Sequence, residues 1–198
     1  MFGWGVWVSL APAEPGVGER RPESMTLTRL LPSLRRTLSD PISHDLWPEA
    51  TIVTTTDVVV SGISLLRLVE VCGTPCIHSG AAIVPGTNGR PSDTAKTAVL
   101  VVRVTDVMLR ASGDTVIETD ARLDNLRLIW SETRLINRAS TAHSGVALIA
   151  GRPVDQELAF TADVASVDLP LDLTVGDLLA IPSRSFPGHQ PAWLSALE

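Results

Sequence analysis

The sequence predicts a mainly β fold, an antiparallel barrel or sandwich with one or two short N-terminal helices. From residue 98 onward, runs rich in β-branched residues follow one another with short turns between them, which is typical of such folds. Two of these runs, 98–110 and 114–123, flank a glycine-containing turn and predict a hairpin. Hydrophobic residues make up 44% of the 198 residues, so the chain can bury a core of its own.

Charge and hydropathy argue against two classes of partner. The net charge of −6 disfavours nucleic acid, which needs a clustered basic face. No apolar run approaches the roughly 18 residues that would span a bilayer, so we expect no membrane partner. The opening stretch MFGWGVWVSLAPAEPG has no basic residue before its apolar part, as a secretory signal would carry, and we therefore expect a cytoplasmic protein.

The chain divides into one predicted domain with extensions at both ends. Residues 1–24 are rich in Gly and Pro and are expected to be disordered, or to be a mis-assigned extension with translation starting at Met25. Residues 25–45 predict a helix and a loop, and residues 46–183 a single β-domain. Residues 184–198 form a tail whose Trp193 is expected to pack back on the body.

Local signals place the first elements. Leucines spaced by three and four residues predict a short amphipathic helix, although Pro32 interrupts the pattern (Leu27, Leu30, Leu31, Leu34, Leu38). Trp47 is expected to anchor the loop that follows on the core. Residues 50–64 predict a strand pair that turns at Ser61–Gly62, and Ser64 and Gly73 read as the cap and the stop of a second helix.

The second half is read as strands and turns. Residues 85–97 contain two prolines, two glycines and several small polar residues, which predicts an exposed loop. Turns are also predicted at Ser144–Gly145 and at 151–153. The remaining strand-like runs are 129–139, 144–153, 158–170 and 173–183.

Two cysteines and a histidine resemble a fragment of a metal site. Structural zinc needs four ligands, and the other histidines are scattered without ligand spacing, so Cys72, Cys76 and His78 do not complete one. We interpret both cysteines as buried small hydrophobes, because free cysteine is commonly buried and Gly73–Pro75 between them is unlike a redox motif.

Paired carboxylates give no firmer sign of chemistry. Asp120 with Asp124, and Asp163 with Asp168, are interpreted as turn residues that hydrogen-bond locally. The sequence contains no Ser-His-Asp motif, phosphate loop or dinucleotide fingerprint. Motifs alone therefore predict no reaction.

Several stretches together resemble the β-domain of the fold-type III pyridoxal-phosphate decarboxylases, especially the bacterial diaminopimelate decarboxylases. The run LWPEATIVTTTDVVVSGISLLRLVEVCGTPCIHSGAAI is similar to the amino-terminal part of that domain. The runs VVRVTDV, TDARLDNLRLIWSETRLINRAS and VDLPLDLTVGDLLAIPS are similar, in the same order, to its carboxy-terminal part. The resemblance covers residues 46–84 and about 99–183, and implies that Gly73–Pro75 is a helix-to-strand turn.

The resemblance also implies that the catalytic parts are missing. In the family a (β/α)8 barrel of roughly 250 residues, with the Schiff-base lysine and the phosphate site, separates the two pieces, whereas here residues 85–98 fill that place. The family's Cys-Glu-Ser-Gly-Asp motif has no counterpart, and the chain has no Tyr for its Gly-Ala-Tyr motif. The one lysine, Lys96, lies in the predicted polar loop and lacks the pocket that a Schiff base needs.

A few positions of the family motif survive. Asp124, Asn125 and Arg127 match it, and by the resemblance the arginine position helps to hold a substrate carboxylate. A structural ion pair is the alternative role for Arg127. With Trp130, these residues are the predicted contacts for a ligand or partner, and no catalytic residue, cofactor or metal is expected.

Three functions follow as expectations. The first is a non-catalytic, stand-alone β-domain that acts as an interaction or accessory module, as a homodimer or with a pyridoxal-phosphate-barrel relative. The second is a subunit of a split decarboxylase. The third is a small-molecule-binding barrel whose mouth is lined by Arg127 and Trp130.

Overall fold

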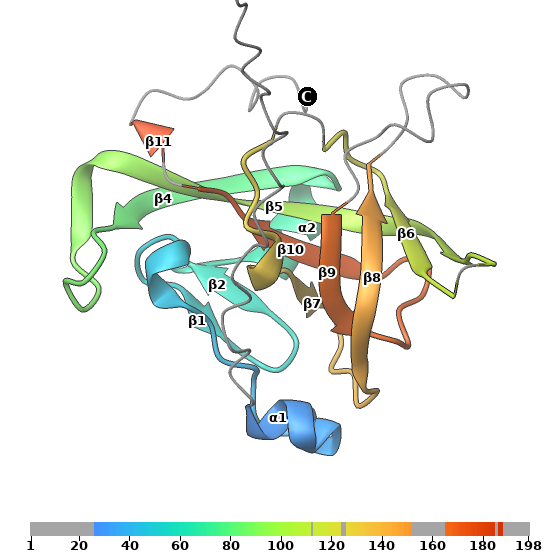
Figure 1. Cartoon of the computed structure of the whole chain (residues 1–198). Helices are drawn as coiled ribbons and strands as arrows, with labels where there is room; N and C mark the ends of the chain where they lie inside the picture. Colours follow the sequence, from blue (N-terminus) through green and yellow to red (C-terminus); the bar gives the residue numbers. More distant parts are fainter. Residues whose placement is uncertain (1–25, 112, 124–125, 152–164, 185, 188–198) are drawn as a thin grey trace, which may run out of the picture.

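The computed structural model describes residues 26–111, 113–123, 126–151, 165–184 and 186–187 (Figure 1). The extension 1–24 and most of the tail, with Trp193, lie outside them. The described chain is mainly β, with short helices and a barrel-like mixed sheet, which confirms the predicted fold class. Within these residues no helix is long and apolar enough to cross a membrane.

A small antiparallel sheet and one helix precede the main sheet. Strands β1 (Ile52–Val53), β2 (Val58–Val60) and β3 (Ile63–Ser64) pair in that order, and the predicted turn at Ser61–Gly62 is confirmed by positive φ angles of 49° and 83°. Helix α2 (Leu65–Cys72) begins where the Ser64 hydroxyl accepts a bond from the Arg67 N–H at 3.1 Å, and ends at Gly73 with φ 77°. The predicted cap at Ser64 and the predicted stop at Gly73 are therefore both confirmed.

The main sheet follows the order β7-β10-β5-β6-β8-β9, and β4 and β11 also pair with β5. Its strands are β4 (Cys76–Ile83), β5 (Pro91–Leu109), β6 (Thr115–Thr119), β7 (Arg134–Ile136), β8 (Ser144–Ala150), β9 (Ala165–Pro170), β10 (Leu178–Pro182) and β11 (Phe186–Pro187). The pairs are antiparallel except β6 with β8. The predicted hairpin is β5–β6.

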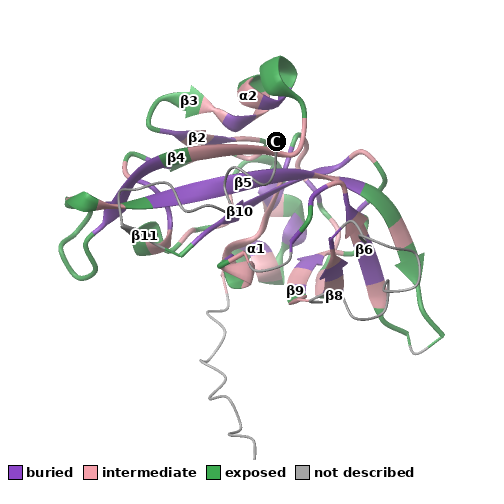
Figure 2. Ribbon diagram, turned by 90° about the horizontal axis from the view of Figure 1, so that it is seen from above, coloured by how far each residue is buried: buried purple, intermediate pink, exposed green. Residues whose placement is uncertain are grey.

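Strand β5 divides the interior into two cores. Leu100, Val102 and Val104 lie in one cluster, packed with β6, β8 and β9, whereas Val99 and Val101 lie in the other with Trp47 and helix α2. Successive strand residues point to opposite faces, so one strand serves both clusters. Figure 2 shows the middle of β5 coloured as buried. Trp47 is fully buried, which confirms its predicted anchoring role.

Two predicted loops are strand in the structure. β5 begins at Pro91, so only residues 84–90 connect it to β4, and the exposed loop predicted over 85–97 is wrong from Pro91 onward. The polar residues there extend the strand because they pair with β4 and β11, and proline is tolerated as the first residue of a strand. The turn predicted at Ser144–Gly145 is also wrong, because both residues open β8.

The predicted N-terminal helix is short, and it buries polar residues while its leucines are mostly exposed. It consists of α1 (Leu27–Leu30) and the 3-10 helix η1 (Pro32–Arg36). Its buried residues are Thr28, Pro32 and Arg35, whereas Leu27 is 65% and Leu31 56% exposed. The leucine spacing therefore does not mark a face buried on the core, as a short amphipathic helix would require.

The Ser64→Ala variant is expected to lower the free energy of unfolding by about 2 kcal/mol, since it removes both a helix cap and a hydrogen bond to a carboxylate. Ser64 Oγ donates to Asp57 Oδ2 at 2.5 Å as well as capping α2. Urea denaturation measures the difference. Ser79→Ala, at an exposed position of β4, is the control and should change stability by less than about 0.5 kcal/mol. Equal stabilities of the two variants would contradict the role given to the cap.

Candidate functional site at the seam of the sheet

The main sheet does not close between its two end strands. β7 and β9 are the ends of the strand path and lie beside each other without pairing. A cavity of about 210 Å³ lies along this seam, and we call it the seam cavity. Its walls come from β7, β9, the 3-10 helix η3 (Trp130–Glu132), residues 53–58 and the N-terminal segment, residues 26–41.

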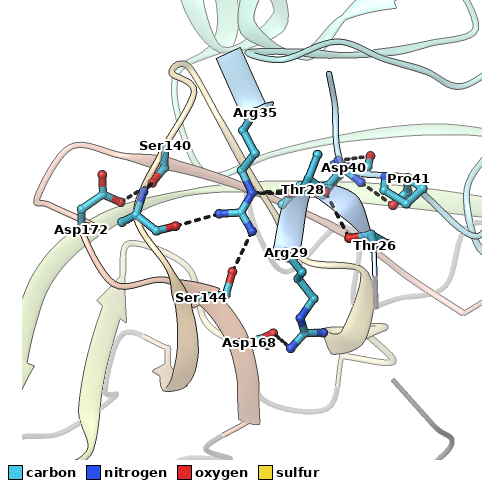
Figure 3. Close-up of polar contacts among 12 residues, drawn as sticks. Thr26, Thr28, Arg29, Arg35, Asp40, Pro41, Ser140, Ser144, Asp168 and Asp172 are labelled. Atoms are coloured by element: carbon cyan, nitrogen blue, oxygen red, sulfur yellow. Dashed lines mark hydrogen bonds and ion pairs between the residues drawn. The ribbon is translucent and has the colours of Figure 1, made fainter. Parts of the chain in front are cut away.

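Arginine side chains tie the N-terminal segment to β8 and β9 (Figure 3). Arg29 forms an ion pair with Asp168 of β9. Arg35, which is 8% exposed, donates to the Ala142 carbonyl at 3.0 Å and to Ser144 Oγ at 2.8 Å. It also pairs with Asp40 within its own segment, Nε to Oδ2 at 3.0 Å. The segment is therefore held mainly by charge-assisted hydrogen bonds.

Arg134 ties the other edge of the seam to the same segment. Its Nη1 donates to the Pro41 carbonyl at 3.0 Å, and its Nη2 donates to the Asp40 carbonyl. In the described part of the chain it forms no ion pair. Burial lowers the pKa of Arg134, against the opposing effect of Asp40 and Glu132.

The carboxylates at the cavity already have donors. Glu132 Oε2 accepts the Trp47 indole N–H at 2.9 Å and the Ser43 N–H at 3.2 Å. Asp57 Oδ1 accepts the backbone N–H groups of Val58 and Leu66 at 2.8 and 3.2 Å. These carboxylates therefore position the cavity walls.

Arg138, on the cavity wall, pairs with two aspartates behind it. Its guanidinium bonds to Asp177 at 2.7 Å and to Asp172 at 3.1 Å. Burial opposes ionisation of Asp177, but the hydrogen bonds from Arg138 and from the Thr174 N–H outweigh it and hold the pKa of Asp177 below its ordinary value. The hydrogen bond to Asp177 is the main reason that the pKa of Arg138 is raised.

The predicted contact residues lie mostly away from this cavity. Arg127 is exposed and does not line it, although its carbonyl accepts the Arg184 N–H at 2.7 Å. Trp130 is half-buried against the larger core and opens η3, whose next two residues do line the cavity. Asp124 and Asn125 lie outside the described residues.

The other candidates are not assembled into a reactive site. Cys72 is exposed, so the prediction that both cysteines are buried is wrong for it, because it lies at the open end of α2. Cys76 is half-buried, and burial, with smaller effects from Cys72 and Asp120, raises its pKa to about 11. Asp168 belongs to strand β9 and pairs with Arg29, so it is not the turn residue that was predicted. Across the described residues there is no cluster of three or more metal-binding side chains.

Sequence reasoning missed the arginines at the seam. The available signal was the spacing of Arg134, Ile136 and Arg138 by two residues, which would place both arginines on one face of the predicted strand 129–139. In the structure that strand ends at Ile136. A scan against protein-family models found no match, and a search of curated proteins found none either. The decarboxylase resemblance therefore stays a hypothesis.

The Asp177→Asn variant is expected to lose about 3 kcal/mol of stability at neutral pH, because it leaves the Arg138 guanidinium without its main charged partner. Since the pKa of Asp177 is depressed in the folded state, its contribution is present above the unfolded value near 4 and is lost as pH falls through the folded value. The stability difference from wild type should therefore shrink below pH ~4. Thermal unfolding from pH 3 to 7 measures it, with Asp45→Asn at an exposed position as the control. A difference independent of pH would contradict this assignment.

Proposed function

We propose that this protein is a non-catalytic, decarboxylase-like β-domain that acts in the cytoplasm as an interaction module. The observation that carries the proposal is the exposure of four leucines in the N-terminal segment. Leu27, Leu30, Leu31 and Leu38, which we call the leucine set, are 65%, 53%, 56% and 51% exposed. Large apolar side chains gathered in one exposed segment are typical of a surface that binds another protein.

The apolar area of the leucine set is enough for a weak interaction between two proteins. Covering a side chain that is more than half exposed contributes about 1 kcal/mol, so a two-fold interface that uses all four leucines twice gains about 8 kcal/mol. Association itself costs about 4–15 kcal/mol. The leucines alone therefore support a weak complex, and neighbouring contacts set its final strength.

The proposed partner is a second copy of the chain. In the resembled family this domain contributes to the dimer interface, and a copy that lacks the barrel can use the same kind of association. A pyridoxal-phosphate-barrel relative is the alternative partner. It would restore the split decarboxylase, in which the exposed Arg127 side chain could meet a substrate.

The double variant Leu30→Gln/Leu31→Gln is expected to abolish self-association, because it replaces two exposed leucines of the set by polar residues. Sedimentation velocity should give a concentration-dependent dimer for wild type and a monomer for the variant, up to about 100 µM. At a concentration low enough for both proteins to be monomeric, the melting temperature should stay the same, since neither leucine is buried. Val71→Gln, at a 72% exposed valine of α2, is the matched control and should remain dimeric. A wild-type chain that is monomeric throughout would contradict the homodimer.

Pyridoxal phosphate is expected to leave the protein without an adduct at Lys96. The side chain is exposed on β5, so nothing desolvates the amine or holds the aldehyde against it. The measurement is the visible spectrum with added pyridoxal phosphate, followed by borohydride reduction and peptide mass mapping. A stoichiometric adduct at Lys96 would contradict a non-catalytic role.

A further inference from the structure

The connection between β4 and β5, residues 84–90, holds the one Asn-Gly pair of the sequence. The chain has three asparagines, and only the first is followed by glycine (Asn88, Asn125, Asn137). An asparagine is chemically vulnerable where the next backbone nitrogen can reach its side-chain amide carbon. Glycine hinders that approach least, because it has no Cβ. The sequence therefore concentrates this reactivity at Asn88 and Gly89.

Both residues of the pair are exposed in the structure. Their φ angles are 54° and 94°, in the left-handed region that a tight turn requires and that asparagine and glycine tolerate. The Val84 N–H donates to the Arg90 carbonyl at 2.9 Å and closes the turn behind them. A Cβ built at Gly89 would meet no atom within 4 Å. Water and hydroxide can therefore reach the peptide bond between the two residues.

The hydrogen bonds of the turn bypass the pair. Thr87 Oγ1 donates to the Val84 carbonyl at 2.5 Å and accepts the Arg90 N–H at 3.3 Å. Among the described residues, neither the Asn88 side-chain amide nor the Gly89 N–H has a hydrogen-bond partner. Rotation about the Asn88 backbone therefore breaks no hydrogen bond made by either residue, and it can bring the Gly89 nitrogen to the amide carbon.

Asn137 shows the opposite arrangement at a similar backbone conformation. It is also exposed, with a φ of 77°. Its Oδ1 accepts the Leu178 N–H at 3.3 Å, and its own N–H donates to the Thr56 carbonyl at 2.8 Å. Arg138 follows it, so a side chain crowds the next nitrogen. Asn137 therefore shares the exposure and the positive φ of Asn88, but not the free amide or the following glycine.

We propose that Asn88 is a self-modification site, at which the chain converts its own amide into a carboxylate. The Gly89 nitrogen forms a bond to Cγ of Asn88, and the side-chain amide leaves as ammonia, which carries away the Gly89 proton. One water then opens the cyclic imide without any change of oxidation state. Opening at Cγ gives aspartate, and opening at the backbone carbonyl gives isoaspartate, whose main chain runs through the former side chain. This inference goes beyond the interaction module and does not depend on it.

The modification changes the connection and leaves the sheet paired. The β4–β5 pairing nearest the turn is Ile83 with Pro91, so the extra backbone carbon of isoaspartate at residue 88 lies outside the ladder. The new carboxylate adds one negative charge to a chain whose net charge is already −6. It appears at a cavity that Asn88 lines together with His44 and Asp45. The charge of this cavity therefore changes as the protein ages.

The test is incubation of the full, folded chain at neutral and at mildly alkaline pH, followed by peptide mass mapping. The peptide that contains Asn88 should gain the mass difference between an amide and a carboxyl group, with isoaspartate and aspartate as separate products. Conversion should be faster at alkaline pH, because the attacking nitrogen has to lose its proton. The peptide that contains Asn137 should stay unchanged over the same time.

Variants of the turn separate the chemistry from general exposure. Gly89→Ala should slow the conversion at least about tenfold, because a Cβ hinders the attacking nitrogen. Asn88→Gln, whose longer side chain cannot close the same ring, should show no conversion at residue 88. Arg90→Gln, at an exposed position of the same turn, is the matched control and should convert as wild type does.

Three results would overturn the proposal. They are an Asn88 peptide that stays unchanged in the folded chain while it converts in urea, equal conversion at Asn88 and Asn137, and a conversion rate unchanged in Gly89→Ala. If Gly89→Ala does not fold, the comparison of Asn88 with Asn137 within the wild-type chain still decides the matter. The dimer test with the leucine variants uses sedimentation and not mass, so the two proposals fail separately.

Discussion

The register of strand β5 is the constraint on which the rest of the structure depends. Its residues 99–104 alternate between the two cores, and β10 does the same, with Leu179 and Ile181 on one side and Leu178 and Ala180 on the other. A slip of one residue would exchange the two apolar sets and place each against the wrong neighbours. Trp47 can be fully buried only because β5 presents Val99 and Val101 to its side of the sheet. Both the small sheet with α2 and the strands beyond β6 are thus positioned by one strand.

The open seam lies where the two end strands of the main sheet, β7 and β9, meet without pairing. β5 carries β10 and β7 in one direction and β6, β8 and β9 in the other, so the two branches meet at β7 and β9. These short end strands do not pair, and unpaired edges need to be covered. The N-terminal segment covers them through guanidinium groups on both sides. Its Arg29 and Arg35 reach Asp168 of β9 and Ser144 of β8, and Arg134 of β7 donates back to the Pro41 carbonyl. This explains why Arg35 and Thr28 are buried in a segment whose leucines are not. Because the N-terminal segment covers the seam with charged side chains, the space beneath it is a partly polar cavity. Apolar side chains at the same place would have filled it as part of the core.

The elements that could be predicted are those fixed by neighbouring residues. The Ser64 cap, the turn at Ser61–Gly62 and the β5–β6 hairpin each depend on a few adjacent side chains, and the structure confirms all three. The strand over 91–98 could not be predicted because its polar residues show no strand pattern of their own. They are ordered by pairing with β4, which directly precedes them, and with β11 near the end of the described chain. Gly145 read as a turn residue, but it lies in β8, beside the exposed side chain of Leu171. The role of Arg134 could not be recognised either, since its hydrogen bonds to the carbonyls of Asp40 and Pro41 form only in the assembled seam.

The N-terminal segment joins the closure of the sheet to the proposed interface. Its outward side carries the leucine set, and its inward side is held by Arg134 through the carbonyls of Asp40 and Pro41. Association through the leucines requires that segment to be ordered, so the arginine contacts that dock the segment also support the proposed dimer. Binding free energies coupled through one element are reciprocal. Association must therefore strengthen the docking of the segment by the same factor by which docking strengthens association.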